Sequence, residues 1–490
     1  MQRLSGLDAG FVYMETPNNH MHVAATCVFD PSEIPGGWSF ERLREMIASR
    51  LHMVPPFRRR LLSVPLELHH PVWVEDPDFD IEYHVRRAAL PSPGGDRELT
   101  EFAADIISRP LHRDHPLWEM HVVEGLENGM VAIVTKTHHA AVDGVSGAEL
   151  AVILLDLSPT PTMGEPPETE WKGERLPSEI ELLGGAMIEL STQPAKAVKA
   201  FRRTAEVALS LRRRNREPDV APPPSLFAAP RSSINTSITP HRRFAYTQVS
   251  LDDVKAIKNT LGGTVNDVVL AICAGALRRY FDGLREHVEG SLVAMVPLSV
   301  RTEEEKGAMG NKLSQLLVSL HTDINDPVER LHAISEGTGH AKEQEGAVGV
   351  ATMLEDWVEF AAPGLAARAA RLYARTKMAD RHRPLFNVTI SNVPGPNFPL
   401  YSAGARMVAM YPMGPIFDGG GLNMTVMSYM GQMYFGLVGC RETVPELWGL
   451  AAGLNDSLDE LRKAAAAASK PAGATPKQAG ATGKKAASSK

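Results

Sequence analysis

The chain has 490 residues, of which 43% are hydrophobic and 22% charged, and a formal net charge of −7 at pH 7. This length exceeds one ordinary hydrophobic core and predicts two or three globular units, while the acidic balance argues against nucleic-acid binding. The three cysteines lack the spacing of a metal site or a disulfide framework, as expected for a protein kept in a reducing cytosol. The first residues lack the apolar core of a signal peptide, so export by that route is not expected.

Residues 1–160 form the first predicted unit, which mixes strand and helix patterns. Residues 81–89 are expected to be extended and residues 97–107 helical. A hairpin follows in residues 118–136, where two apolar strands flank Asn128-Gly129, the strongest short hairpin motif. The hairpin predicts a strand that delivers two histidines at its end.

The segment His138-His139-Ala-Ala-Val-Asp143-Gly144 carries the residue types of an acyl-transfer site. Neighbouring side chains on a strand point to opposite faces, so only one of the two histidines can face a given cavity. A histidine with a pKa of about 6.5 is largely neutral at pH 7. It can therefore take the proton of a hydroxyl and then protonate a departing thiolate. Residues 146–156 are expected to form a buried helix after this motif.

Two other chemistries have weaker support. A serine nucleophile is disfavoured because Ser146 does not lie in a G-x-S-x-G elbow. A metal site is disfavoured because adjacent histidines diverge, and the sequence has no H-E-x-x-H motif or cysteine pair. We therefore expect direct acyl transfer with no covalent enzyme intermediate, no metal and no cofactor. Asp143 is expected to orient the loop, and Gly144 to permit its tight turn.

A proline-rich linker with a helical interior occupies residues 161–230. Its helical pattern, residues 178–216, is interrupted at Pro194, and residues 195–216 combine an apolar stripe with basic side chains. Such a helix can lie in a membrane interface. It can equally pack its stripe on the body of the protein, and the sequence leaves both interpretations open.

Residues 231–461 form the second predicted unit. Residues 419–440 are uncharged, yet glycines and polar residues divide them into two short strands joined by a turn, which argues against a membrane span. Strands and helices mixed in both units predict two α/β sandwiches side by side. The elements expected here are helices over 249–261 and 265–282, and strands over 291–296, 313–321, 387–392, 422–427 and 433–438.

Residues 462–490 are expected to form a disordered basic tail, because an Ala/Lys/Pro/Gly composition cannot bury a core. Its lysines could aid solubility or attract anionic lipid. Seven of the 20 methionines fall within residues 407–433. Flexible thioethers suit a pocket for acyl chains of variable length, but ordinary core filling is the simpler interpretation.

The histidine motif resembles the signature of the bacterial wax ester synthase/diacylglycerol acyltransferase family, in its actinobacterial form. The resemblance covers about residues 1–461. It implies a pair of chloramphenicol acetyltransferase-like α/β domains, joined by the crossover linker, with an active-site tunnel between them. It is carried by further segments in both halves: Leu4–Ala9, Pro116-Leu117-Trp118, Asn266-Asp267, Pro297–Arg301, Gly310-Asn311 and Asn392–Pro396.

The resemblance also implies roles for the residues of the motif. His139 would be the general base and His138 would support the loop. Asp143 would hold the loop by a polar contact, with Arg301 as a candidate partner, and Gly144 would form the turn.

Residues outside the motif receive supporting roles from the same resemblance. Pro116, Leu117 and Trp118 would shape the strand and the tunnel without reacting. Asn266 and Asp267 would matter for activity, but the same residue types could equally cap a helix.

The function that the resemblance implies is transfer of a long-chain acyl group from acyl-CoA to diacylglycerol, which makes triacylglycerol. Two alternatives are the synthesis of wax esters or of esters of another lipid alcohol, and a lipid-surface binding protein with negligible turnover. Acyl-CoA would be a substrate and not a cofactor. The expected location is cytoplasmic, at the periphery of the inner membrane or of lipid inclusions.

Overall fold

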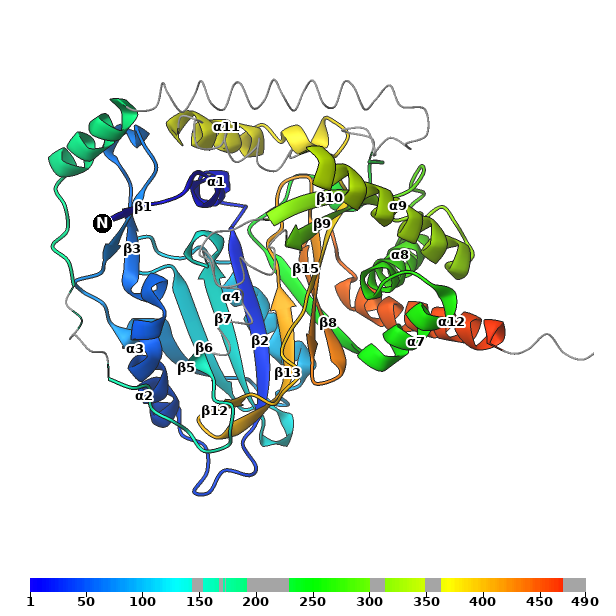
Figure 1. The fold of residues 1–490 in the computed structure, drawn as a ribbon, viewed down its shortest axis with the longest axis horizontal. Helices are drawn as coiled ribbons and strands as arrows, with labels where there is room; N and C mark the ends of the chain where they lie inside the picture. The colour runs from blue at the N-terminus through cyan, green and yellow to red at the C-terminus, as the bar shows by residue number, and fades with distance from the viewer. Residues whose placement is uncertain are drawn as a thin grey trace, which may run out of the picture.

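The computed structural model describes residues 1–142, 153–166, 171, 173–191, 229–299, 313–348 and 363–469. Within these residues, two six-stranded sheets lie next to each other and helices cover the outer face of each one (Figure 1). A small three-stranded sheet, β1-β4-β3, lies at the N-terminal edge. The architecture is mixed α/β with two halves, as the sequence predicts.

The first half is built on a sheet in the order β12-β13-β2-β7-β6-β5. Its elements are β1 (Gln2–Arg3), α1 (Gly6–Met14), β2 (His22–Asp30), α2 (Phe40–Arg50), β3 (Arg59–Leu62), η3 (Pro65–Glu67), β4 (Val72–Glu75), α3 (Ile81–His84), β5 (Val85–Ala89), α4 (Asp96–Ile107), β6 (Trp118–Glu124), β7 (Val131–His138) and η5 (His139–Ala141). Strands β6 and β7 pair antiparallel across a turn in which Asn128 has a φ of 60°, which confirms the predicted hairpin. Helix α4 confirms the helix predicted over 97–107.

The extended segment predicted over 81–89 is wrong in its first part. Asp80 caps a single helical turn, α3, by accepting a hydrogen bond from the backbone N–H of Glu82 at 2.9 Å. A side-chain cap of this kind satisfies an N–H that would otherwise have no partner at the start of the turn. The chain becomes extended only at Val85, where β5 begins.

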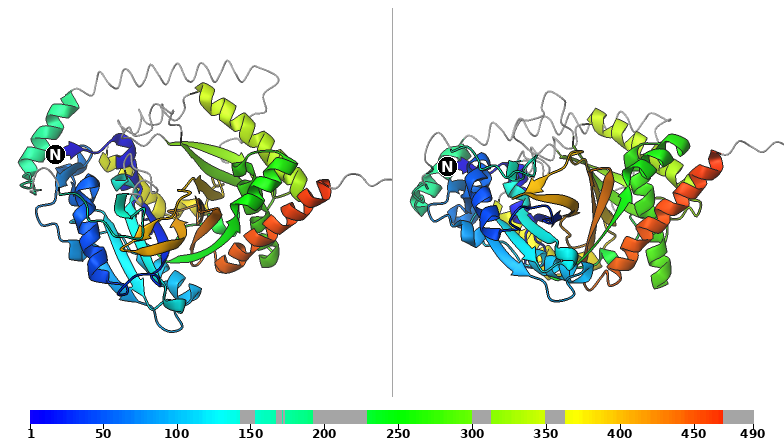
Figure 2. Two further views of the ribbon diagram at one scale, coloured as in Figure 1. Left: turned by 60° about the horizontal axis from the view of Figure 1, so that its bottom comes forward. Right: turned by 90° about the horizontal axis from the view of Figure 1, so that it is seen from below.

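The second half is built on a sheet in the order β10-β9-β11-β14-β15-β8. Helices α8 and α12 cover the face of this sheet that points away from the first half (Figure 2). The elements are β8 (Arg242–Ser250), α7 (Leu251–Leu261), α8 (Val265–Leu284), β9 (Val293–Ser299), β10 (Leu313–Ser319), α9 (Pro327–Val348), α11 (Pro363–Arg375), η8 (Met378–Asp380), β11 (Val388–Val393), β12 (Tyr401–Ser402), β13 (Ala405–Met413), β14 (Leu422–Tyr429), β15 (Gln432–Cys440) and α12 (Leu447–Ala468).

All the elements predicted for this half are present, with two corrections at their ends. Strand β9 continues past Pro297 to Ser299, where β10 still pairs with it, whereas its pairing with β11 covers only Ala294 and Met295. Helix α12 runs to Ala468, so the first residues assigned to the tail are helical. Alanine has the highest helix propensity, and Ala465 is buried against the core.

One strand of the second half completes the sheet of the first half. Strand β13 pairs antiparallel with β2, and Tyr411 of β13 stacks on Tyr246 of β8 with ring centroids 3.8 Å apart. The two sheets approach closely at Gly436, where a Cβ atom would lie 1.7 Å from the backbone oxygen of Pro412. The sequence did not predict that β13, a strand of the second half, pairs with the sheet of the first half. This pairing holds the two halves together.

The apolar segments of the second half belong to its core. Strands β14 and β15 occupy residues 419–440 as the sequence predicts, and six of the seven clustered methionines are buried, the exception being Met430 in the turn. No single helix of the described residues is long and apolar enough to span a membrane. The pair α7 and α8 passes that test only together, bent by 102°, and 13 of the 20 residues of α8 are buried.

Only part of the linker lies among the described residues. Residues 179–191 form a helix, in agreement with the first part of the predicted pattern. The basic segment 195–216 lies outside the described residues, as do most of the helix predicted over 146–156 and the tail beyond residue 469.

Candidate active site

Strand β7 ends at His138, and the two histidines leave the sheet in different directions. His138 lies opposite His22 of β2, and its backbone N–H donates to the oxygen of Leu117 at 2.9 Å. His139 begins the turn η5, and its N–H donates to the oxygen of Met21 at 2.8 Å. The predicted strand therefore delivers both histidines, and neighbouring strands fix the backbone at this point.

Both ring nitrogens of His138 face protein groups. Nδ1 accepts a hydrogen bond from the backbone N–H of Ala140 at 3.0 Å and so caps η5. An accepting Nδ1 places the proton of the neutral ring on Nε2. Nε2 lies 3.3 Å from Oε1 of Glu15, and the side chain is 3% exposed. His138 is thus a buried brace of the turn.

Glu15 is the acidic group at the centre of this cluster. Its Oε1 accepts from the N–H of Met21 at 3.3 Å, and its Oε2 accepts from Arg113 at 2.7 Å. His22 Nε2 lies 3.6 Å from Oε1. Burial favours the neutral acid, but the neighbouring rings of His138 and His22 and the hydrogen bond from Arg113 outweigh it and lower the pKa of Glu15. The carboxylate is therefore ionised.

His139 has different surroundings. Phe11 of α1 stacks on its ring with centroids 3.9 Å apart and an angle of 20°. Its Nδ1 is buried without a hydrogen-bond partner among the described residues. Burial, assisted by the nearby His138, lowers the pKa of His139 to about 4. The ring is neutral at pH 7, which is the state that a general base requires.

The segment Pro116-Leu117-Trp118 buttresses the histidine turn. Leu117 packs with Ala140 and Ala141 in one apolar cluster. Trp118 is fully buried, donates from Nε1 to the oxygen of Phe57 at 2.9 Å, and stacks on His84. These contacts fix the backbone next to the histidine turn, and the tunnel-shaping role stays a prediction. Asp143, Gly144 and Arg301 lie outside the described residues, so their predicted roles stay predictions.

Asp267 lies in the second half, in the first turn of α8. Its Oδ2 accepts from the backbone N–H and the hydroxyl of Thr264 at 2.8 and 2.9 Å, which makes a capping box. Thr338 of α9 donates to Oδ1 at 2.6 Å. The structure thus shows that Asp267 takes part in capping α8 and that it also links α8 to α9. Asn266 is half-buried beside it.

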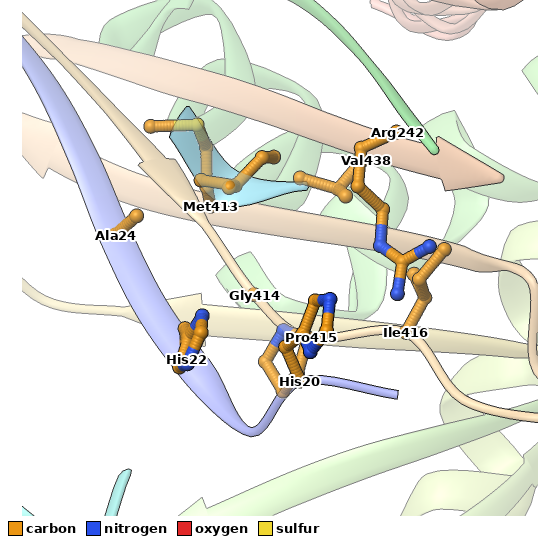
Figure 3. Close-up of a pocket in the computed structure, with 10 residues that line it drawn as sticks. His20, His22, Ala24, Arg242, Met413, Gly414, Pro415, Ile416 and Val438 are labelled. Carbon is orange, nitrogen blue, oxygen red and sulfur yellow. The ribbon is translucent and has the colours of Figure 1, made fainter. Parts of the chain in front are cut away.

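A small cavity of about 10 Å³ lies beside His20 and His22 at the junction of the two halves (Figure 3). That volume holds one water molecule. His20 and His22 of β2, Arg242 of β8 and Met413 at the end of β13 line it. Both ring nitrogens of His22 are buried without a hydrogen-bond partner among the described residues. Burial first, and then the charges of Lys136, His138 and His20, hold the pKa of His22 well below its usual range, although Glu15 opposes this.

Sequence reasoning missed the groups that surround the histidines. Phe11 and Glu15 belong to α1, more than a hundred residues before the motif, and Arg113 lies in the loop before β6. The alternation of His20 and His22 at the start of an apolar strand could have indicated a polar face on β2. No sequence spacing relates Glu15 to His138, because only the pairing of β2 with β7 brings them together. Among the described residues, no cluster of three His, Cys, Asp or Glu side chains could hold a metal ion.

The two linked α/β halves and the histidine-bearing turn define an acyltransferase of the chloramphenicol acetyltransferase-like type. The family model for the wax ester synthase/diacylglycerol acyltransferase catalytic domain matches residues 4–269, and the model for the C-terminal domain of that family matches residues 309–462. The chain belongs to this family.

Similar proteins agree with that assignment. A Mycobacterium tuberculosis protein provisionally named a diacylglycerol O-acyltransferase is 40% identical over 468 residues, which are 94% of this chain and 90% of the relative. The solved wax ester synthase/diacylglycerol acyltransferase of Marinobacter aquaeolei VT8 is 32% identical, with a TM-score of 0.65, over 95% of this chain and 100% of that one. The first condensation domain of the calcium-dependent antibiotic synthetase shares the fold, with a TM-score of 0.55 and 13% identity over 95% of this chain and 96% of that domain.

Proposed function

We propose that the protein transfers a long-chain acyl group from acyl-CoA to the hydroxyl of diacylglycerol and so makes triacylglycerol. The observation that carries the mechanism is the contrast between the adjacent histidines. His138 is held in the turn through Nδ1 and lies with Nε2 3.3 Å from the carboxylate of Glu15, whereas burial keeps His139 neutral. The names of the mycobacterial relatives support diacylglycerol as the acceptor.

His139 would act through Nε2, because its Nδ1 is buried. Nε2 takes the proton of the acceptor hydroxyl while the hydroxyl oxygen attacks the thioester carbonyl. The tetrahedral intermediate then collapses, the carbon–sulfur bond breaks, and the CoA thiolate takes the proton back from Nε2. The products are the ester and free CoA, and no acyl-enzyme forms.

The test is an acyl-transfer assay with the full-length protein and a long-chain acyl-CoA. His139→Ala should lower the rate of ester formation by about 10²–10⁴-fold, the usual contribution of a general base. His332→Ala is a matched control, because His332 is exposed on α9 and its Nε2 bonds to the carbonyl oxygen of Leu261. A His139→Ala variant with near wild-type rates would overturn the mechanism.

The acceptor is tested in the same assay by offering diacylglycerol, a long-chain alcohol and a branched lipid diol separately and resolving the neutral lipids. We expect the highest kcat/KM with diacylglycerol. A preference for the long-chain alcohol would favour wax ester synthesis, an alternative that the name of the Marinobacter enzyme keeps open. Absence of any ester, with binding to lipid vesicles retained, would favour a lipid-surface binding protein.

We further propose that the enzyme works peripherally at the inner membrane or at lipid inclusions. The support is an apolar rim, defined as exposed side chains of η3, the helix over 179–191 and α11, along the edge of the molecule that also carries α1 (Figure 1). The segment 364–379 carries four cations and no acid, which suits an anionic lipid surface. The rim consists of Leu66, Leu68, Ile180, Met187, Ile188, Leu365 and Leu372.

Sedimentation with phosphatidylglycerol-containing vesicles tests the rim. Leu365→Glu combined with Leu372→Glu should reduce the bound fraction, because both leucines are more than half exposed on α11. Leu157→Glu is the control, since Leu157 is equally exposed and lies next to the bridge between Asp156 and β12, at the opposite end of the molecule. Equal binding of all three proteins would refute a role for the rim.

A further inference from the structure

We propose that Glu15 is a positioning residue of the acyl-transfer site, which fixes the proton of His138 on Nε2 and thereby holds the turn that carries His139. Its kinetic test rests on the proposed function. Its spectroscopic test does not, because it observes the ring of His138 directly.

The first step of the argument is the hydrogen-bond pattern of His138. The N–H of Ala140 can bond to Nδ1 only while Nδ1 carries no proton. The neutral ring must then carry its proton on Nε2, where it would be a buried donor. Oε1 of Glu15 lies 3.3 Å from Nε2, which has no hydrogen-bond partner among the described residues, and a small rotation of either side chain would let Oε1 accept from that N–H. Without this acceptor, the alternative tautomer would place a proton on Nδ1 against the N–H of Ala140 and release the turn.

The second step is that the carboxylate is itself held in place. Oε1 accepts from the N–H of Met21, and Oε2 accepts from Arg113. Met21 also accepts, through its carbonyl, the N–H of His139. Glu15 is only 14% exposed. A carboxylate fixed from two sides and shielded from water orients a partner more strongly than a surface ion pair does.

The third step is that one helix contacts both histidines. Glu15 is the C-terminal cap of α1, and Phe11 of the same helix stacks on His139. Arg113, which binds Glu15, also donates to the carbonyl of Val12 in the last turn of α1 at 3.3 Å. Displacement of the carboxylate would therefore disturb His138 directly and, through α1, the ring that covers His139.

The kinetic test compares Glu15→Ala, Glu15→Gln and the wild type. Glu15→Ala should lower kcat by about 10–100-fold, the effect of a small misplacement of a reacting group, with KM for acyl-CoA unchanged. Glu15→Gln should recover most of the lost kcat, because its amide oxygen can still accept from His138 and Met21.

Glu75→Ala is the matched control. Glu75 accepts from Arg59 at 2.7 Å and is 18% exposed, so it is paired and buried like Glu15, but it lies in the small sheet. We expect Glu75→Ala to change the thermal midpoint and to leave kcat unchanged. If Glu15→Ala only lowered stability, as Glu75→Ala should, Glu15 would be a structural ion pair and the proposal would be overturned.

The spectroscopic test measures the tautomer in protein labelled with ¹⁵N-histidine, with His138 assigned by comparison with His138→Gln. Long-range ¹H–¹⁵N spectra should show the Nε2–H form of His138 in the wild type and in Glu15→Gln, and its loss in Glu15→Ala. An unchanged tautomer in Glu15→Ala would overturn the proposal even if the protein proved to be an acyltransferase. The expected change in a protein that formed no ester would support the positioning of His138 while the proposed function failed.

Discussion

The two halves of the molecule bury different kinds of side chain. All six fully buried histidines of the described residues lie in the first half, together with Lys136 and Glu119. In the second half, the core around α8 is almost entirely aliphatic, and Asp267 at the helix start and Arg330 are its buried charged groups. The buried titratable groups thus lie mostly in the first half, while the second half supplies an apolar core and the strand β13.

This difference has an energetic consequence. Burial of a polar group costs free energy unless its hydrogen bonds are remade, and the first half contains rings such as His22 whose nitrogens have no hydrogen-bond partner among the described residues. In α8 the hydroxyl of Tyr280 is the comparable group, and no histidine is buried there. We therefore expect the first half to be sensitive to pH and the second half to be sensitive to the loss of packing.

The largest expected effect is acid destabilisation. Burial lowers the pKa of His20, His84 and His139 to about 4, and that of His22 further. The unfolded chain takes up protons first, near pH 6.5, so stability is complete above pH 6.5 and is lost as the pH falls towards 4. At ~1.4 kcal/mol for each pKa unit, the loss sums to several kcal/mol. A thermal midpoint that stayed constant between pH 7.5 and 5 would contradict this expectation.

The next largest effect separates the two cores by mutation. Lys136 is 1% exposed, donates to the carbonyls of Ile106 and Arg109 at 3.1 and 3.2 Å, and lies 3.5 Å from Glu119. Lys136→Ala leaves that carboxylate buried without its main cation and should cost about 3–5 kcal/mol in urea unfolding at pH 7.5. Loss of Lys136 should raise the pKa of Glu119 from about 2, so the deficit should shrink as the pH falls and the carboxylate becomes protonated.

Leu270→Ala in α8 is the matched comparison for Lys136→Ala. It removes a fully buried aliphatic side chain and should cost about 2–5 kcal/mol. That cost should be the same at pH 7.5 and pH 5, because no titratable group is involved. If the loss of unfolding free energy changed with pH in the same way in both variants, the two halves would not differ in their sensitivity to pH.

A third variant acts where the halves meet. In Gly436→Ala the new Cβ would clash with the backbone oxygen of Pro412, which cannot move aside as a flexible side chain could. We expect a loss of about 1–3 kcal/mol and a lower thermal midpoint. Gly283→Ala in α8 is the control, because nothing lies within 4 Å of its Cβ position and a helical alanine is favoured. Equal midpoints for the two variants would show that β13 and β15 can separate without cost.

The sequence predicted those features that depend on local pattern. The hairpin β6–β7, the helices α4, α7 and α8 and the strand pair β14–β15 follow from periodicity and turn residues within one segment. Strand β13 could not be assigned to the first sheet in this way, because its pattern suits either sheet and only pairing with β2 decides between them.

The same limit applies to the site. His138 and His139 were found because they lie in one short motif behind a strand. Glu15 and Phe11 were not found, since their importance depends on how α1 packs on η5 and no spacing in the sequence encodes that contact. Motif residues are therefore predictable from sequence, whereas the groups that distinguish one histidine from the other require the fold.

The smallest expected effect concerns Asp267, for which the sequence left a catalytic and a capping explanation open. If the residue serves as the N3 member of the capping box of α8, with Thr264 as the N-cap, and as the tie to Thr338, Asp267→Ala should lower the free energy of unfolding by about 1–2 kcal/mol. Asp267→Asn should cost less, because the amide oxygen of asparagine can still accept from the backbone N–H of Thr264. The rate per folded molecule should be unchanged in both. A large loss of kcat in a folded Asp267→Asn variant would instead show that the second half contributes a charge to catalysis. The catalytic groups would then not be confined to the first half.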